Sequence, residues 1–268
     1  MAGAPFIEID GVSKSFDGGR SFAVREVSLA VPQGAFVALV GASGSGKTTT
    51  LKTVNRLAEP DSGEVRIEGR PVGAGRAALL RRSIGYVFQG VGLFPHLSVA
   101  ENIGITPKLL GWSDAEIAAR TAELLDLVGL PRDYAGRAPD ALSGGERQRV
   151  GVARALAARP RIVLMDEPFG ALDPITRDGL ATAYRALHDR LGLTTLMVTH
   201  DVQEAILLAD RIVVMKAGRV LADDTPRALM AGAADPDVAA LMDMPRRQAA
   251  RVRALIEGQG HGEGLADG

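Results

Sequence analysis

Eight consecutive residues in the first fifth of the sequence have the types and spacing of a loop that binds phosphate. They follow the pattern G-x-x-x-x-G-K-T, from Gly41 to Thr48. Glycines let successive backbone N–H groups turn inward around an anion. In this pattern the lysine reaches the β- and γ-phosphates and the threonine hydroxyl ligates Mg²⁺. The residues expected to contact phosphate are Gly41, Ser43, Gly44, Ser45, Gly46, Lys47, Thr48 and Thr49.

Two adjacent carboxylates, Asp166 and Glu167, directly follow the apolar run of residues 162–165. At the carboxyl end of a parallel strand beside a phosphate loop, Asp166 is placed to hold Mg²⁺ through its water shell. Glu167 is then placed to take a proton from an attacking water. An acidic turn at a strand end is common by itself. Together with Lys47, however, the pair predicts a hydrolase that acts on a phosphate-bearing substrate.

Two further residues are ambiguous. His200 follows residues 194–199, which are expected to form a buried strand, and a lone histidine after a strand is more often structural. If strand ends converge there, His200 can instead hydrogen-bond a γ-phosphate. Phe16 lies between two strand-like segments, where an ordinary core position is favoured from the residue alone and stacking on an adenine ring is the alternative.

The segments that position these residues predict an α/β fold. Residues 36–40 are a short apolar run directly before the phosphate loop, as expected of a strand that is buried on both faces. A helix is predicted after the loop, over residues 49–57. Alternating segments, which predict a small antiparallel sheet beside that strand, are residues 6–12, 27–31 and 65–69. Further strands are predicted over residues 84–88, 162–165 and 194–199, and a hairpin over residues 211–223 around Ala217 and Gly218.

Residues from about 90 to 160 predict a mostly helical insertion between strands of the core. Ser98 with Glu101, and Ser113 with Glu116, have the spacing of capping boxes that begin helices. Ser143 and Glu146 repeat this spacing in the stretch from Leu142 to Gln148. Gly144 and Gly145 lie inside that first turn, where each costs about 1 kcal/mol relative to alanine. A plain capped helix and a helix end that a ligand approaches closely are about equally favoured.

Composition limits the class of protein. The chain has 268 residues, a formal net charge of −1 and no cysteine, which excludes disulfides and thiolate metal sites and argues against a broad nucleic-acid surface. The N-terminus lacks the pattern of a signal peptide, and no apolar stretch is long enough to span a membrane. Any membrane role is therefore expected to come through a partner. After residue 226 we expect short helical pieces, and a disordered glycine-rich tail over residues 258–268.

Taken together, these segments resemble the ATP-binding subunit of ABC transporters over about residues 6–225. Residues 41–48 match the Walker A loop, residues 162–167 the Walker B strand, and residues 142–148 the signature motif, with Glu146 where glutamine is usual. The single-residue matches are Gln89 to the glutamine loop, Asp173 to the D-loop, His200 to the switch histidine and Phe16 to the adenine-stacking aromatic.

The resemblance implies an ABC ATPase domain over residues 1–225: a P-loop NTPase core with a flanking antiparallel β-subdomain and an inserted helical subdomain at about residues 90–160. A short helical extension with a disordered tail, residues 226–268, would follow it. ATP and Mg²⁺ are implied as ligands. The implied catalytic residues are Lys47, Gln89, Glu167 and His200. The implied metal ligands are Thr48, Gln89 and Asp166. The implied nucleotide contacts outside the phosphate loop are Phe16, Ser143, Gly144, Gly145 and Asp173.

The family pattern also implies that two copies pair head to tail around two nucleotides, with the phosphate loop of one copy facing the Ser143 helix of the other. Glu146 departs from this pattern, because a carboxylate that pointed toward the phosphates would repel them. We therefore expect Glu146 to point away and to cap its own helix.

Residues 86–103 and 107–112 resemble more closely the ATPase subunits of bacterial osmoprotectant importers for glycine betaine, carnitine, choline or proline. This implies transmembrane permease subunits at the cytoplasmic face of the inner membrane, an extracytoplasmic substrate-binding protein, and no nucleic-acid partner. The residues after 226 are too few for the paired regulatory domains of some relatives. Alternatives are an importer for another small solute such as an amino acid, a soluble non-transport ABC ATPase, and a regulator without turnover. The last alternative is disfavoured because the residues expected to support turnover are all intact, namely Lys47, Asp166, Glu167 and His200.

Overall fold

A computed structural model describes residues 5–90, 92–170 and 172–259. The larger of its two sheets has six strands in the order β10-β9-β3-β8-β7-β6, all parallel except β10. Its strands are β3 (Phe36–Val40), β6 (Ile84–Val87), β7 (Ile162–Asp166), β8 (Thr194–Val198), β9 (Arg211–Lys216) and β10 (Arg219–Asp224). The second sheet is antiparallel in the order β2-β1-β4-β5. Its strands are β1 (Ile7–Lys14), β2 (Val24–Val31), β4 (Ser62–Ile67) and β5 (Arg70–Pro71).

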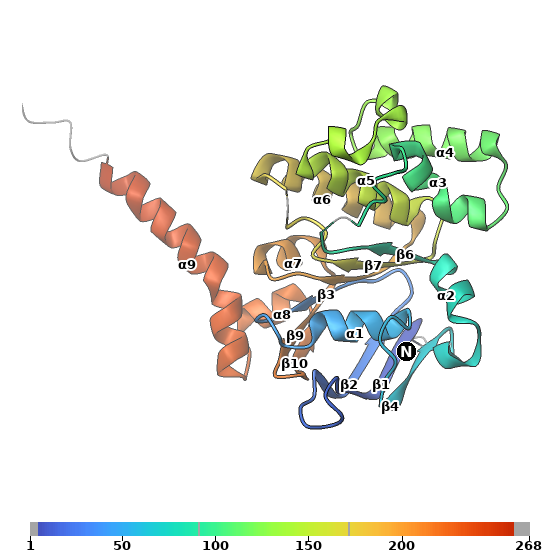
Figure 1. Ribbon diagram of the computed structural model, residues 1–268. Helices are drawn as coiled ribbons and strands as arrows, with labels where there is room; N and C mark the ends of the chain where they lie inside the picture. The colour runs from blue at the N-terminus through green and yellow to red at the C-terminus, as the bar shows by residue number, and fades with distance from the viewer. Residues whose placement is uncertain (1–4, 91, 171, 260–268) are drawn as a thin grey trace, which may run out of the picture.

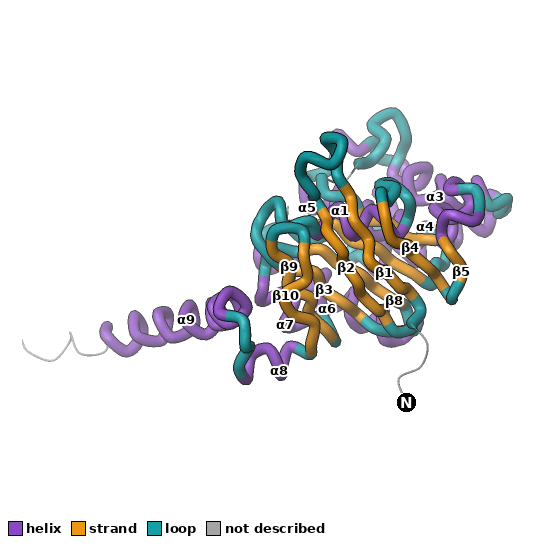
Figure 2. The backbone as a smooth tube through the Cα atoms, turned by 90° about the horizontal axis from the view of Figure 1, so that it is seen from below, coloured by secondary structure: helices purple, strands orange, loops and turns teal. Residues whose placement is uncertain are grey.

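The helices divide between the two faces of the six-stranded sheet, as Figure 1 shows, with α1 between the two sheets and α5 to α7 on the opposite side. Their bounds are α1 (Lys47–Val54), α2 (Ala77–Ser83), α3 (Val99–Leu109), α4 (Asp114–Leu127), α5 (Gly144–Leu156), α6 (Pro174–Leu191), α7 (Val202–Leu208), α8 (Pro226–Ala231) and α9 (Pro236–Gln259). The view from below in Figure 2 shows the antiparallel sheet covering the other layers.

The central strands are buried along their whole length because both faces are covered. In β3, Phe36, Ala38 and Val40 pack into the helical side, while Val37 and Leu39 pack toward α1 and the antiparallel sheet. This explains the uninterrupted apolar run that precedes the phosphate loop. The expected α/β class with a flanking antiparallel sheet is therefore confirmed.

Local signals in the sequence correspond to observed turns and helix ends. Ser98, Ser113 and Ser143 each accept a hydrogen bond from the backbone three residues later, in complete capping boxes that begin α3, α4 and α5. The hairpin β9–β10 turns at Ala217 and Gly218, whose φ angles of 48° and 77° fit a tight two-residue turn. The helices α3 to α5 form the group expected at about residues 90–160, between the adjacent strands β6 and β7.

The C-terminal region differs from the expected short helical pieces. After the short α8, the helix α9 has 24 residues, and it includes Gly258 and Gln259, which we expected to be disordered. Asp235 begins this helix by accepting N–H groups of Asp237 and Val238, and Val238 and Met242 are buried in the core. A single glycine in a helix costs only about 1 kcal/mol, so Gly258 does not stop it. Figures 1 and 2 both show the second half of α9 projecting from the body of the molecule.

The rest of the expected tail, residues 260–268, lies outside the described residues, and the division of the chain after residue 225 stays a prediction. Among the described residues, no helix is both long and apolar enough to cross a membrane.

Candidate functional site

The loop of residues 41–48 turns tightly after β3, and two of its glycines could not be replaced by another residue without a collision. At Gly41, with φ at 146°, a Cβ atom would lie 2.1 Å from the carbonyl oxygen of Met215. At Gly46, with φ at 99°, it would lie 2.4 Å from the carbonyl oxygen of Ala23. Both positions therefore need glycine for its backbone conformation and for its lack of a side chain. Ser43 and Gly44 are exposed at the tip of the loop, and Ser45 is buried beneath it.

The end of this loop presents positive charge. Helix α1 begins at Lys47 without a side-chain cap, so backbone N–H groups of its first turn, which includes Thr48 and Thr49, are available to an anion. The Lys47 ammonium donates to the carbonyl oxygens of Gly41 at 2.7 Å and Ala42 at 2.9 Å. Burial lowers the pKa of Lys47, and the nearby carboxylates of Glu167 and Asp166 oppose that shift. A ligand with several negative charges would draw this ammonium away from the loop carbonyls.

Asp166 and Thr48 lie side by side at the edge of the sheet. The Thr48 hydroxyl donates to Oδ1 of Asp166 at 2.7 Å, and Asp166 is only 3% exposed. Burial raises the pKa of this carboxyl group, and the Thr48 hydrogen bond opposes the rise. A buried carboxylate beside a hydroxyl is a donor set that suits Mg²⁺. Among the described residues, no group of three histidine or acidic side chains could hold a metal, so a cation here would also need oxygens from a ligand or water.

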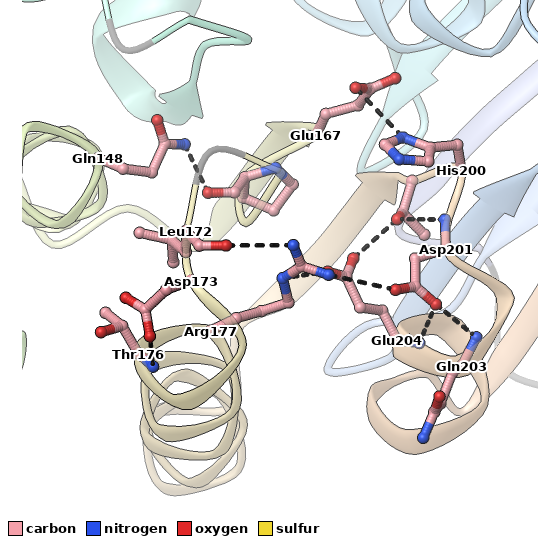
Figure 3. Close-up of polar contacts among 12 residues, drawn as sticks. Gln148, Glu167, Leu172, Asp173, Thr176, Arg177, His200, Asp201, Gln203 and Glu204 are labelled. Carbon is pink, nitrogen blue, oxygen red and sulfur yellow. Dashed lines mark hydrogen bonds and ion pairs between the residues drawn. The ribbon is translucent and has the colours of Figure 1, made fainter. Parts of the chain in front are cut away.

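Glu167 is the point at which three strand ends meet. Gln89, after β6, donates from Nε2 to Oε2 of Glu167 at 3.2 Å, and Nδ1 of His200, after β8, lies 3.4 Å from the same oxygen. The Glu167 amide donates to the carbonyl oxygen of Val198 at 2.9 Å. The φ angle of Glu167 is 48°, in the left-handed region. A left-handed conformation costs a non-glycine residue about 1–2 kcal/mol. The neighbouring strands β6, β7 and β8 thus place an amide, a carboxylate and an imidazole together (Figure 3 shows Glu167 and His200).

The start of α5 forms a second group of predicted residues. The Ser143 amide donates to Oε2 of Glu146 at 2.7 Å, and the hydroxyl of Tyr134 donates to Oε1 at 3.1 Å. The hydrogen bond from the Ser143 backbone lowers the pKa of Glu146. The Glu146 carboxylate therefore caps its own helix, as expected. Gly144 and Gly145 follow in the first turn, and a Cβ on Gly145 would lie 3.2 Å from the Leu172 side chain.

Asp173 caps the next helix beside this group. Its Oδ1 accepts the Thr176 amide at 3.0 Å, which begins α6, and this bonding lowers the pKa of Asp173. Gln148, in the second turn of α5, donates to the carbonyl oxygen of Pro168 (Figure 3). The helix of Ser143 is thereby tied to the segment that directly follows Glu167.

The position of Phe16 in the structure differs from the one that the sequence favoured. The residue is 71% exposed, with the Lys14 ammonium 5.5 Å from the ring centre, so the core position that was favoured from the residue alone is wrong. The segment before it ends the strand β1, and the residues that follow form a turn outside the core. An exposed aromatic ring can stack on a planar ligand.

Three residues of the site were not identified from the sequence: Tyr134, Gln148 and Arg177. Tyr134 lies in a short 3-10 helix, η2 (Arg132–Gly136), and Arg177 lies in the first turn of α6. Only the position of Gln148 within the signature-like stretch could have pointed to it. The contact of Tyr134 with Glu146 and that of Arg177 with Asp201, which is 24 residues further along the chain, are decided by the tertiary structure.

Comparisons with known proteins agree with this geometry. Residues 24–170 match the family described as ABC transporter. The carnitine transport ATP-binding protein OpuCA of Listeria monocytogenes is 50% identical over 82% of this chain and 55% of its own length. The glycine betaine uptake system ATP-binding protein YehX of Escherichia coli is 49% identical over 84% of this chain and 72% of its own length.

Among solved structures, a dimeric ATP-binding cassette, MJ0796, in a post-hydrolysis state with bound ADP and phosphate is 33% identical, with a TM-score of 0.76. The match covers 82% of this chain and 98% of that one. The chain spans little more than half the length of the carnitine transport relative.

Proposed function

Because the chain belongs to the ABC transporter family, we propose that it is the ATP-hydrolysing subunit of a bacterial importer for quaternary-amine osmoprotectants such as glycine betaine or choline. The observation that carries the hydrolytic part of the proposal is the meeting of Gln89 and His200 at one carboxylate oxygen of Glu167. An oriented carboxylate beside a phosphate loop is the arrangement that a general base for water requires.

In this proposal each group at the strand ends has a separate task. Glu167 orients the attacking water and accepts its proton, and Gln89 holds the carboxylate in place. His200, which is 65% exposed, hydrogen-bonds the γ-phosphate as the charge on its oxygens grows. Lys47 moves from the loop carbonyls to the β- and γ-phosphates, where its charge is closer to the transferred group.

Nucleotide binding would use the loop and the exposed aromatic ring. The N–H groups of residues 41–49 surround the phosphates, and Phe16 stacks on the adenine. Thr48 and Asp166, with Gln89 nearby, fit Mg²⁺, which when bound neutralises part of the phosphate charge. Thr48 donates a hydrogen bond to Asp166, so a cation held by both oxygens would take the place of this hydrogen bond while the Thr48 hydroxyl keeps its proton.

A second copy would complete each site. Ser143, Gly144, Gly145 and Asp173 lie on elements other than the phosphate loop and the strand ends, and their helix start presents N–H groups and small residues. We propose that this surface closes on the γ-phosphate bound by the other copy, head to tail. Support comes from the dimeric state of the similar solved cassette. Loss of the γ-phosphate would remove the contacts that hold the two copies together.

A permease subunit would bind where Gln89 joins the core to the helical group. A groove there is lined by side chains of α2, α5 and β6, including Arg81 and Arg154, and by Leu57 and Phe88, which follow α1 and β6. Leu57 and Phe88 are large and exposed, which is typical of a protein-binding surface. This contact would hold the chain at the cytoplasmic face of the membrane, opposite an extracytoplasmic substrate-binding protein, and would let Gln89 report the state of the nucleotide.

The test is a transport assay in cells of the source organism that lack this gene. Uptake of labelled glycine betaine, choline and proline is measured at high and normal salt, with rescue by the wild type or by Glu167→Gln. We expect uptake of glycine betaine or choline to fall and to return only with the wild type. Loss of proline uptake alone would instead favour an importer for another small solute such as an amino acid. Unchanged uptake of every compound, together with ATP hydrolysis by the purified chain, would contradict the osmoprotectant assignment.

A further inference from the structure

The side chain of Arg177 joins two loops of the site, as Figure 3 shows. Its Nη2 donates to the carbonyl oxygen of Leu172 at 3.2 Å, directly before Asp173. Its Nη1 donates to Oδ2 of Asp201 at 3.5 Å, and its Nε lies 3.8 Å from Oε1 of Glu204. One guanidinium group therefore contacts the backbone that precedes Asp173 and both carboxylates that follow His200.

These two carboxylates in turn fix the backbone on either side of His200. Glu204 accepts the Thr199 hydroxyl at 2.7 Å, and that hydroxyl accepts the Asp201 amide at 3.0 Å. Asp201 also caps α7 by accepting the amides of Gln203 at 2.9 Å and Glu204 at 3.2 Å. The orientation of His200 thus depends on a network that Arg177 closes from the side of α6.

The network needs a cation at this position. The Glu204 side chain is only 10% exposed, and a buried carboxylate is costly unless it is paired and hydrogen-bonded. Burial raises the pKa of Glu204, whereas the Thr199 hydrogen bond and the charge of Arg177 oppose that rise. A planar guanidinium can hold a carbonyl and two carboxylates at the same time, whereas an ammonium is a point charge with a shorter reach across the three.

We propose that Arg177 is a positioning residue that couples the Asp173 loop to the His200 loop. When the Asp173 loop moves, the guanidinium moves the Asp201–Glu204 segment with it and so sets the imidazole of His200 beside Glu167. The link to hydrolysis rests on the proposed function, in which a second copy contacts Asp173. The coupling of the two loops rests only on the contacts of this chain.

The test compares two arginines of the same helix. Arg185 is the matched control, because it also contacts a backbone carbonyl, that of Leu208, and two carboxylates, Asp189 and Asp210, away from His200. With the purified full chain, Arg177→Ala is expected to lower kcat for ATP at least about tenfold, with KM changed less than about twofold. Arg177→Lys should restore part of kcat. Arg185→Ala should leave kcat close to that of the wild type, even if it lowers the melting temperature.

Amide hydrogen exchange provides a readout that does not depend on turnover. In Arg177→Ala, exchange over residues 199–205 should become faster, while Arg185→Ala should leave this segment protected. If Arg177→Ala unfolds, Glu204→Gln serves as the second variant, with the same expected loss of kcat and of protection. Equal effects of the alanine variants, in proportion to their loss of stability, would overturn the proposal. A wild type that does not hydrolyse ATP would refute the proposed function alone, since exchange still decides the coupling.

Discussion

The carboxylate of Glu167 lies 3.4 Å from Nδ1 of His200, across the ends of the neighbouring parallel strands β7 and β8. Gln89 reaches the same carboxylate oxygen from β6. This contact depends on the order of strands in the sheet, because the three residues lie far apart in the sequence. Contacts of this kind let us predict how specific substitutions change activity and stability.

The first prediction concerns Glu167→Gln. The amide keeps the shape of the side chain but cannot accept a proton from water, so kcat for ATP should fall by about 10²–10⁴ while ATP binding is retained. The measurement combines phosphate release with equilibrium binding of ATP by the purified chain. Glu59→Gln, which alters an exposed carboxylate that pairs with Arg56, serves as the control. An unchanged turnover number for Glu167→Gln would refute its role as the base.

The second prediction compares alanine substitutions at two glycines of the phosphate loop. Gly46→Ala would place a Cβ atom 2.4 Å from the Ala23 carbonyl oxygen, whereas Gly44→Ala, with φ at 76°, meets nothing within 4 Å. Both substitutions carry backbone strain of about 1–2 kcal/mol. Only Gly46→Ala must also displace backbone, so it should lower the melting temperature more and weaken ATP binding more. Thermal unfolding with and without ATP measures both effects, and equal losses in the two variants would contradict the packing argument.

The third prediction concerns Glu146, which stands where the signature motif of the family usually has glutamine. Glu146→Ala removes the acceptor for the Ser143 amide and the Tyr134 hydroxyl, and should cost about 1–2 kcal/mol of unfolding free energy. Glu146→Gln can keep the cap and should cost less than about 1 kcal/mol with activity retained. The matched control is Glu116→Ala, which breaks the same kind of capping box at the start of α4. Urea unfolding should give similar losses for both alanine variants, while only the change at residue 146 should impair ATP hydrolysis.

The fourth prediction is that the free energy of unfolding depends on pH because of His188. The imidazole is 1% exposed, with Nε2 3.1 Å from the Gly34 carbonyl oxygen and Nδ1 3.0 Å from the Thr195 hydroxyl. The carbonyl can only accept, so Nε2 donates, and in the neutral ring Nδ1 then accepts from the Thr195 hydroxyl. Burial lowers the pKa of His188 below its ordinary value of 6.5, and the charge of Arg185 adds to this.

As the pH falls, the His188 imidazole takes up a proton in the unfolded chain before it does so in the folded chain. The stability that neutral His188 contributes is therefore fully present above about pH 6.5. It is lost as the pH falls through the pKa of His188 in the folded chain. The free energy of unfolding should therefore decrease from about pH 8 to about pH 5 with a smaller slope in His188→Gln than in the wild type. His96→Gln, at an exposed position, should keep the wild-type slope. Identical slopes in all three proteins would exclude His188 as a source of the pH dependence.

Much of the fold followed from local patterns. The apolar run before Gly41 predicted the central strand β3, and the serine and glutamate spacing at Ser98, Ser113 and Ser143 predicted three helix starts. Glu146 was expected to cap its helix, and it does so. These features involve residues only a few positions apart, so the sequence alone contains the information that they require.

Other features depended on which segments pack together. The exposure of Phe16, the packing of Val238 and Met242 of α9 into the core, and the contact of Arg177 with Asp201 depend on how segments that are distant in the chain are arranged. The sequence by itself determined that a phosphate loop, two carboxylates and a histidine follow buried strands. Only the tertiary structure decided that β6, β7 and β8 are neighbours, and so brought Gln89, Glu167 and His200 to a single oxygen atom, because strand order is set by long-range pairing and packing rather than by local spacing.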